Sequence, residues 1–161
     1  MKLILFVALL ATTAVRVQAQ QPELNSILTN YYSLKDALVR DDARDAAGAA
    51  GELFKSINNI NMAAIPAKDH ATFMSLRDKL AFDSRHISES TDIHHQREHF
   101  TSLSANMVTL AKQATLSQQP VYEDYCPMKK AYWLSSETAI KNPYFGSSMP
   151  TCGKVAATLK P

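Results

Sequence analysis

The stretch that decides the fold is residues 22–38, PELNSILTNYYSLKDAL. Its large apolar side chains recur at steps of three and four residues, which places them on one face of a helix. The residues of this face are Leu24, Ile27, Leu28, Tyr31, Leu34 and Leu38. Pro22 suits the first helical position, because an N–H there would have no partner within the helix. We therefore predict an amphipathic helix whose apolar face must be covered by other helices.

Three more segments with the same periodicity follow this first one. The second opens at Asp41-Asp42, and aspartate is a favoured N-cap residue. The third covers about 67–88, and the fourth, for which Thr91 is a candidate cap, ends near Ser117. The connections between the segments are short, which favours antiparallel neighbours. The pattern predicts an all-α fold, an up-down-up-down four-helix bundle.

The last part of the chain departs from this pattern. Residues 121–161 hold four of the seven prolines, two of the four glycines and the only tryptophan. They also carry too many large apolar side chains for a disordered tail. We therefore predict one helical domain over 20–161, in which a bundle (20–117) is covered by an ordered C-terminal loop (118–161) containing at most one helical turn, near residues 135–140.

The N-terminus resembles a secretory signal peptide over residues 1–19. A basic Lys2 precedes an apolar run, and small side chains at Val17 and Ala19 suit signal-peptidase cleavage. Cleavage would also remove Arg16 and leave 15 basic residues against 15 acidic ones, so net charge does not suggest nucleic-acid binding. No later run of about 18 apolar residues suggests a membrane span. We expect an exported protein, periplasmic or secreted.

The two cysteines of the chain each have a methionine close by in sequence. Cys126-Pro127-Met128 stands at one end of a segment and Met149-Pro150-Thr151-Cys152 at the other. Thiolate and thioether sulfurs are the soft ligands that select Cu(I) over hard cations. In an extended Cys-x-Met segment both side chains would share a face. The four sulfur-bearing residues therefore predict a Cu(I) or Ag(I) site if the two ends of the segment meet.

A structural disulfide explains the cysteines equally simply. An exported protein with two cysteines commonly pairs them. A disulfide closing the 25 residues between Cys126 and Cys152 would stabilise the fold by roughly 3–4 kcal/mol in the chain-entropy model. In that reading the protein is an adaptor or interaction module without metal. The methionines favour the metal hypothesis, because a disulfide makes no use of them, but the sequence leaves both hypotheses open.

Two groups of residues carry a family resemblance. The tail group comprises Tyr125-Cys126-Pro127-Met128, Trp133-Leu134-Ser135, Asn142-Pro143-Tyr144-Phe145-Gly146, Met149 and Cys152-Gly153, and the group in the fourth helix comprises Gln96-Arg97, Phe100, Leu103-Ser104 and Met107. Together they resemble an uncharacterised bacterial family catalogued as domain of unknown function 3347. The resemblance implies an exported helical domain, since such proteins are exported and some are fused to adaptors of heavy-metal efflux systems. It further implies copper or silver handling, an efflux complex as partner, and Cys126, Met128, Met149 and Cys152 as metal ligands.

Four of the five histidines crowd the turn between the third and fourth helices: His86, His94, His95 and His99. Two pairs, Asp83-x-x-His86 and Asp92-x-x-His95, have the i, i+3 spacing of the Glu-x-x-His pairs in ferritin-like bundles. A solvated surface cluster explains these histidines as well. If the tail reaches back along the bundle, His99 and His95 are candidates for additional ligands at the sulfur site.

Arg97 and Ser104 are polar residues on the apolar face of the fourth helix. Because buried polar groups need partners, we expect both to dock the tail, Arg97 on backbone carbonyls and Ser104 on a loop amide. The sequence contains no Gly-x-Ser-x-Gly, phosphate-binding glycine loop or His-Glu-x-x-His motif. We therefore assign no catalytic residue and do not expect an enzyme.

Overall fold

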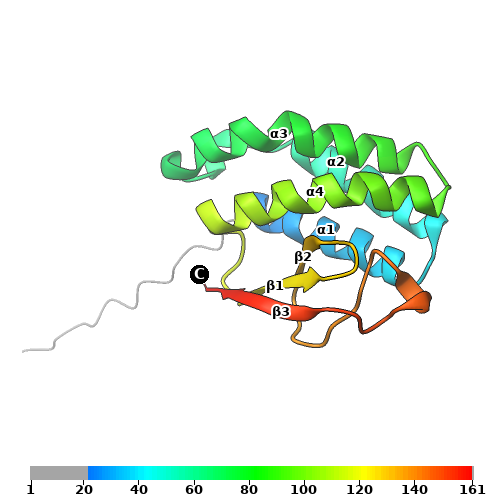
Figure 1. The fold of residues 1–161 in the computed structure, drawn as a ribbon. Helices are drawn as coiled ribbons and strands as arrows, with labels where there is room; N and C mark the ends of the chain where they lie inside the picture. The colour runs from blue at the N-terminus through cyan, green and yellow to red at the C-terminus, as the bar shows by residue number, and fades with distance from the viewer. Residues whose placement is uncertain (1–21, 161) are drawn as a thin grey trace, which may run out of the picture.

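The computed structural model describes residues 22–160, so the expected signal peptide lies outside the described residues. Four helices come first, α1 (Pro22–Val39), α2 (Ala43–Asn58), α3 (Ala67–Ser88) and α4 (Ile93–Gln113) (Figure 1). Three strands follow, β1 (Val121–Cys126), β2 (Ala131–Ser135) and β3 (Lys154–Leu159). Two short 3-10 helices, η1 (Met62–Ala64) and η2 (Gly146–Ser148), complete the elements. No helix among these residues is both long and apolar enough to cross a membrane.

The four helices form the predicted up-down bundle. The apolar stripe of α1 is fully buried, together with Leu53 and Ile57 of α2 and Phe100 and Leu103 of α4. Asp42 caps α2 by accepting a hydrogen bond from Asp45 N at 2.9 Å. Asp92, not Thr91, caps α4, because its side chain accepts from His94 N. Helical periodicity therefore located the helices, while the choice of cap depended on local geometry.

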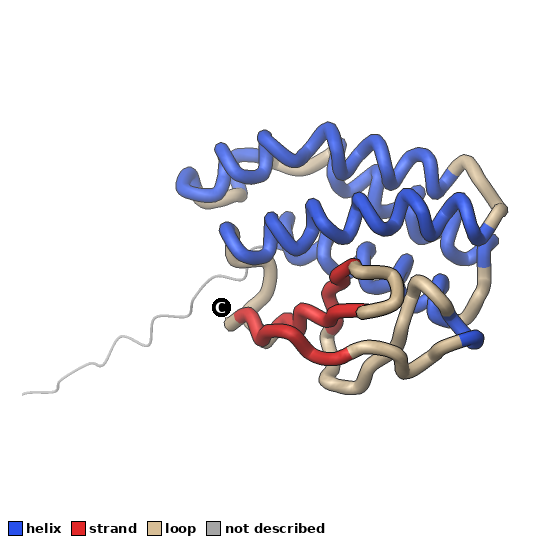
Figure 2. The backbone as a smooth tube through the Cα atoms, viewed as in Figure 1, coloured by secondary structure: helices blue, strands red, loops and turns tan. Residues whose placement is uncertain are grey.

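The prediction of an all-α fold is wrong. The C-terminal region is an antiparallel sheet with the strand order β2-β1-β3, which makes the protein a mixed α/β structure (Figure 2). The alternation that marks a strand is obscured in β1, where Glu123 and Asp124 are both buried beside an irregularity in the β1–β3 register. Residues 136–139 form bends rather than the expected helical turn, and the one short helix between β2 and β3 is η2.

Tyr31 of α1 fixes the sheet against the bundle. Its hydroxyl oxygen accepts a hydrogen bond from Leu134 N of β2 at 3.2 Å and lies 2.7 Å from Ser104 Oγ of α4. The Tyr31 ring stacks on Phe100 with a centroid separation of 5.4 Å. Both residues are fully buried. One side chain therefore links α1, α4 and β2, and it holds the sheet on the face of the helical layer formed by α1 and α4 (Figure 1).

Candidate metal sites

The two cysteines meet at one end of the sheet. Cys126 is the last residue of β1, and Cys152 lies two residues before β3, whose Lys154 pairs with Tyr125. Both are free thiols, Cys126 buried and Cys152 partly exposed. Desolvation raises the pKa of the Cys152 thiol, and the neighbouring Cys126 raises this pKa further. The antiparallel pairing of β1 with β3 thus brings together two thiols that are far apart in sequence.

Asn142 connects the segments that carry the thiols. Its side-chain Nδ2 donates to Cys126 Sγ at 3.2 Å and to the Cys152 carbonyl oxygen at 2.6 Å. Lys129 N also lies 3.4 Å from Cys126 Sγ and donates to it. N–H groups that donate to a ligand atom are a common outer-shell feature of metal sites. Sequence reasoning assigned Asn142 no role, although the residue stands in the tail motif.

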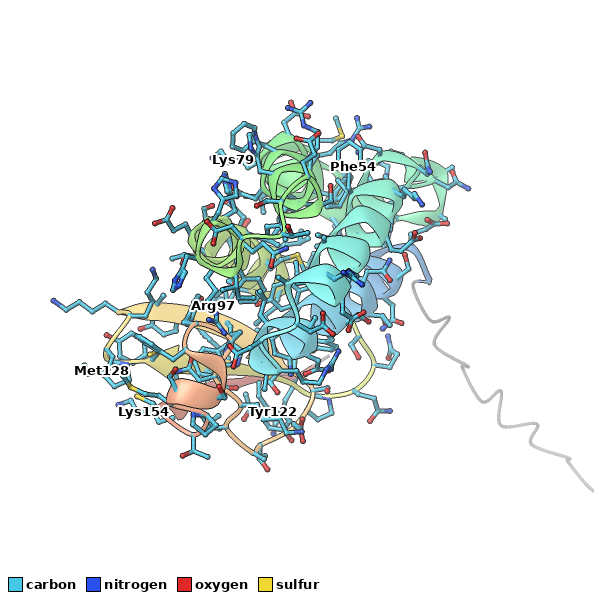
Figure 3. The ribbon with its side chains drawn as sticks, turned by 90° about the vertical axis from the view of Figure 1, so that its right-hand side faces the viewer. Phe54, Lys79, Arg97, Tyr122, Met128 and Lys154 are labelled. Carbon is cyan, nitrogen blue, oxygen red and sulfur yellow. The ribbon has the colours of Figure 1, made fainter. Side chains whose placement is uncertain are left out.

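The methionines flank the thiols in two turns. Met128 lies in the β1–β2 connection rather than in an extended segment, so the expected strand-like Cys-x-Met geometry is wrong. It is 64% exposed, and Figure 3 shows it at the outer margin of the sheet. Met149 is 36% exposed, and its carbonyl accepts from Cys152 N at 3.3 Å in a tight turn. Neither thioether is packed into the core.

Arg97 links the bundle to the loop before β3. Its guanidinium donates to the carbonyl oxygens of Pro143 at 2.9 Å and Leu38 at 2.8 Å, and it pairs with the Asp41 carboxylate (Figure 3). Asp41 also accepts from Ser147 N at 2.9 Å. The hydrogen bonds from Ser147, followed by those from Arg97, lower the pKa of Asp41 to about 2. These contacts hold η2 against the end of α1.

The structure gives Ser104 a different partner from the expected one. Its hydroxyl bonds the Tyr31 hydroxyl. The Tyr31 hydroxyl oxygen in turn accepts a hydrogen bond from Leu134 N in β2. The docking of the sheet therefore passes through a buried tyrosine. Sequence periodicity could not indicate this role, because Tyr31 also fits the apolar stripe of α1.

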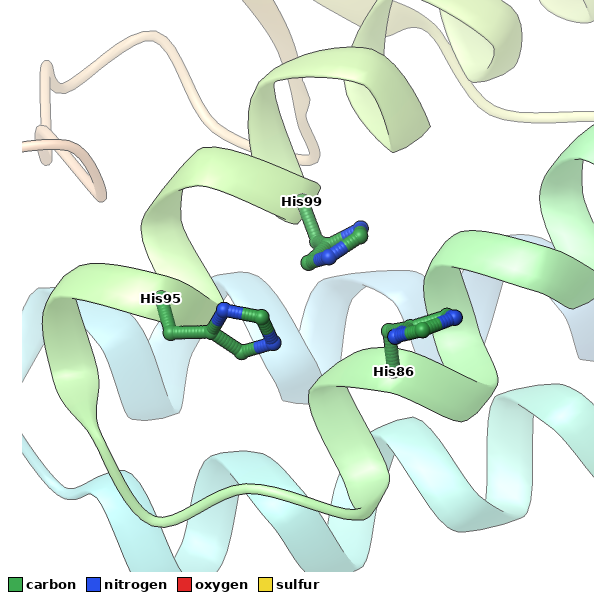
Figure 4. A group of neighbouring side chains, drawn as sticks. All are labelled: His86, His95 and His99. Carbon is green, nitrogen blue, oxygen red and sulfur yellow. The ribbon is translucent and has the colours of Figure 1, made fainter.

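Three histidines converge between α3 and α4. Potential ligand nitrogens of His86, His95 and His99 all lie within 4.8 Å of one another (Figure 4). His94 is exposed and lies outside this group, as do both cysteines. The cluster could hold a metal ion. The expectation that His95 and His99 supplement the sulfur ligands gains no support, since their neighbour is His86.

A buried carboxylate orients one of these rings. His99 Nδ1 lies 2.9 Å from Asp83 Oδ1, and Asp83 is 5% exposed. The sequence suggested pairs within a helix, Asp83 with His86 and Asp92 with His95. The contact instead crosses from α3 to α4, and Asp92 serves as a cap. Spacing along one helix could not reveal the partnership, because it depends on how the two helices pack.

One known family matches more than half of this chain. The model of the family described as Protein of unknown function (DUF3347) matches residues 27–119. The chain belongs to the DUF3347 family. This match confirms the resemblance noted from the sequence. No curated protein and no solved structure matches the chain.

The DUF3347 match begins within α1, covers α2, α3 and α4, and includes the three clustered histidines, Arg97 and Ser104, but it ends before β1. The thiols and methionines therefore lie outside the matched range. Since the family has no known function, membership assigns no activity to the chain. The arguments for a metal site therefore come from the chemistry and positions of the side chains, and not from family membership.

Proposed function

We propose that this protein binds a soft monovalent ion, Cu(I) or Ag(I), at the thiols of Cys126 and Cys152. The observation that carries this proposal is that Asn142 Nδ2 bonds both Cys126 Sγ and the Cys152 carbonyl oxygen, which brings the only two cysteines of the chain together at the end of the sheet. Two thiolates supply a strong soft-metal site, and a thioether can complete a trigonal one. Met149, whose carbonyl oxygen accepts from Cys152 N in the same turn, is a candidate for this third ligand.

The burial pattern of the two cysteines and two methionines supports a protein that carries the ion. Cys126 is buried and held by two N–H donors, whereas Cys152 is partly exposed and both methionines are exposed. An ion can enter from the Cys152 side and leave by the same route through ligand exchange. Such a site suits capture, buffering and delivery of the ion, none of which requires a redox step. Hard cations such as Mg²⁺ and Ca²⁺ prefer oxygen ligands and would not compete.

The proposed setting is outside the cytoplasm, in the periplasm or as a secreted protein. The signal-like N-terminus supports export. The resemblance to domains fused to heavy-metal efflux adaptors supports delivery of the ion to an efflux complex. In that setting the protein has no catalytic role, and its partner is the metal ion itself, followed by the acceptor in the complex.

A second candidate function follows from the same adjacency. Neighbouring thiols in an oxidising compartment also form disulfides. In this alternative Cys126 and Cys152 form a structural disulfide, and the domain is an adaptor without metal. Intact mass after alkylation in denaturant, which exposes the buried Cys126, separates the two hypotheses for protein isolated from its native compartment. Two alkylated thiols favour the soft-metal carrier, and resistance to alkylation without reductant favours the adaptor.

The direct test is a Cu(I) competition titration under anaerobic conditions, with reduced protein and a chromophoric Cu(I) chelator. We expect one tightly bound Cu(I), lost in Cys152→Ser and in Cys126→Ser and weakened about tenfold or more in Met149→Leu, since one fewer ligand costs at least about 1.4 kcal/mol. Cys152→Ser is the cleaner variant, because Cys152 is not fully buried. Met74→Leu is the matched control, because Met74 is exposed on α3. Unchanged Cu(I) affinity in Cys152→Ser would reject the proposal.

A further inference from the structure

We propose that His86, His95 and His99 form a second metal site, which binds a borderline divalent ion, Zn(II) or Cu(II), through three imidazole nitrogens. Their ligand atoms lie within 4.8 Å of one another, and all three side chains are partly buried. The cluster shares no residue with the thiol pair. The inference goes beyond the proposed soft-metal function and does not depend on it.

The helices bring the three rings together. His95 and His99 are four residues apart on α4, so they share one face of that helix. His86 lies in the last turn of α3, on the neighbouring antiparallel helix. The His99 ring is stacked on His86 and is edge-on to His95, each with a centroid separation of 4.7 Å. Figure 4 shows the rings of both helices directed towards a shared space.

Gln96 makes this arrangement rigid. It is fully buried, and its Nε2 donates to the carbonyl oxygens of Ser90 at 2.6 Å and Ala43 at 2.8 Å. These bonds tie the start of α4 to the α3–α4 connection and to α2. Since His95 adjoins Gln96 and His86 lies just before the connection, the ligands are held by a fixed frame. A preorganised frame lowers the entropic cost of binding an ion.

Asp83 sets the tautomer of His99. A buried carboxylate that lies 2.9 Å from Nδ1 accepts its hydrogen, which leaves the Nε2 lone pair of His99 for a metal. Carboxylate–histidine–metal arrangements of this kind are a recurring feature of metal sites. Asp83 is therefore a positioning residue, and His99 is the ligand that it orients.

Ligand type and spacing indicate the ion. Imidazole nitrogen suits Zn(II) and Cu(II), whereas alkaline-earth ions take oxygen. Nitrogens bound to tetrahedral zinc stand about 3.3 Å apart, given bonds of about 2.0–2.1 Å. To bind the ion, the nitrogens must move from the present 4.8 Å limit to that separation, which requires side-chain rotations that unstack His86 from His99. Since all three histidines are partly exposed, a fourth position stays open to water or to an exogenous ligand.

The test uses the whole protein carrying Cys152→Ser, which removes the proposed Cu(I) site while leaving the buried Cys126 in place. Zn(II) and Cu(II) are titrated separately by calorimetry in a buffer that does not chelate metals. We expect one ion per chain and a loss of affinity of 100-fold or more in His95→Ala. Because Cu(II) binds most nitrogen sites more tightly than Zn(II) does, the metal content of protein isolated from its native compartment, and not the relative affinity, identifies the ion. No binding of either ion, or unchanged affinity in His95→Ala, would overturn the inference.

Two variants sharpen this result. His94→Ala is the matched control, because His94 is an exposed neighbour outside the cluster, and it should bind as the wild type does. Asp83→Asn should lower the affinity 10–100-fold. It should also reduce the number of nitrogens seen in the Cu(II) electron paramagnetic resonance spectrum, a change that loss of stability alone would not produce. An equal loss of affinity in His94→Ala and His95→Ala would show nonspecific surface binding and reject the site.

Discussion

The side-chain amide of Asn142 lies 3.2 Å from the sulfur of Cys126 and donates a hydrogen bond to it. The same nitrogen reaches the carbonyl oxygen of Cys152, and Asn142 Oδ1 accepts from Tyr144 N at 2.9 Å. Asn142 is fully buried. It therefore links the end of β1 to the loop before β3, and the spacing of the two thiols depends on it.

Replacing Asn142 by alanine should therefore destabilise the sheet end. We expect Asn142→Ala to lower the free energy of unfolding by about 2–3 kcal/mol, because it leaves buried partners without hydrogen bonds. Urea denaturation measures the change. Asn106→Ala is the control, since among residues 22–160 the Asn106 side chain bonds only Ser102 O, on the exposed side of α4. The stability of this variant should be unchanged or slightly higher. Equal effects of the two substitutions would contradict the role given to Asn142.

Asp41 should make stability fall at acid pH. Because hydrogen bonds lower its pKa to about 2 in the folded protein, its contribution is present above the unfolded pKa of about 3.9 and is lost as pH falls towards 2. The side chain is 34% exposed, so after allowance for solvent screening we expect Asp41→Asn to cost about 1 kcal/mol at pH 6 and nothing near pH 2. Asparagine tolerates the positive φ of 58° at this position.

Urea unfolding of wild type and Asp41→Asn at several pH values measures this difference. Asp78→Asn, at an exposed position of α3, is the control, and it should run parallel to the wild type. If the difference in unfolding free energy between wild type and Asp41→Asn stays constant down to pH 2, ionisation of the Asp41 carboxylate does not contribute to stability.

Asp124 should have the opposite effect on the pH dependence of stability, because it should make stability fall as pH rises. It is fully buried in β1, and neither carboxylate oxygen accepts a hydrogen bond from the described residues. Burial raises its pKa to about 7, against the opposing effect of Lys35. Because the folded pKa exceeds the unfolded one, stability falls as pH rises from about 4 to 7 and then stays level.

Asp124→Asn should remove this dependence. We expect the variant to exceed the wild type in unfolding free energy by on the order of 2 kcal/mol at pH 8 and to match it near pH 4. Chemical denaturation across this range gives the curve. If the unfolding free energies of the wild type and of Asp124→Asn change by the same amount between pH 4 and 7, the pH dependence does not come from Asp124.

Gly153 should not tolerate a side chain. It has a φ of +151°, and a Cβ there would lie 2.9 Å from the Trp133 ring and 3.0 Å from Tyr125 O. We expect Gly153→Ala to cost about 2 kcal/mol or more, from backbone strain and overpacking. Gly48→Ala is the control in the interior of α2, where a Cβ meets nothing within 4 Å, and it should gain about 1 kcal/mol. Thermal unfolding distinguishes the two, and a stable Gly153→Ala would contradict the close approach.

The sheet and the histidine site show where reasoning from sequence stopped. The irregular burial of Glu123 and Asp124 hides the strand alternation of β1, and the sheet is completed by β3 from a distant part of the chain. A single sequence holds no record of such long-range pairing. The Asp83–His99 contact was missed for the same reason, since it crosses two helices.

The sequence alone determined the four helices, because a 3.6-residue periodicity is a local property that forces amphipathic segments to bury one face together. It also determined which sulfur and nitrogen ligands exist. Tertiary structure decided the sheet, the meeting of Cys126 with Cys152, and the grouping of His86 with His95 and His99. These features depend on strand register and helix packing, which bring together residues that no local pattern relates.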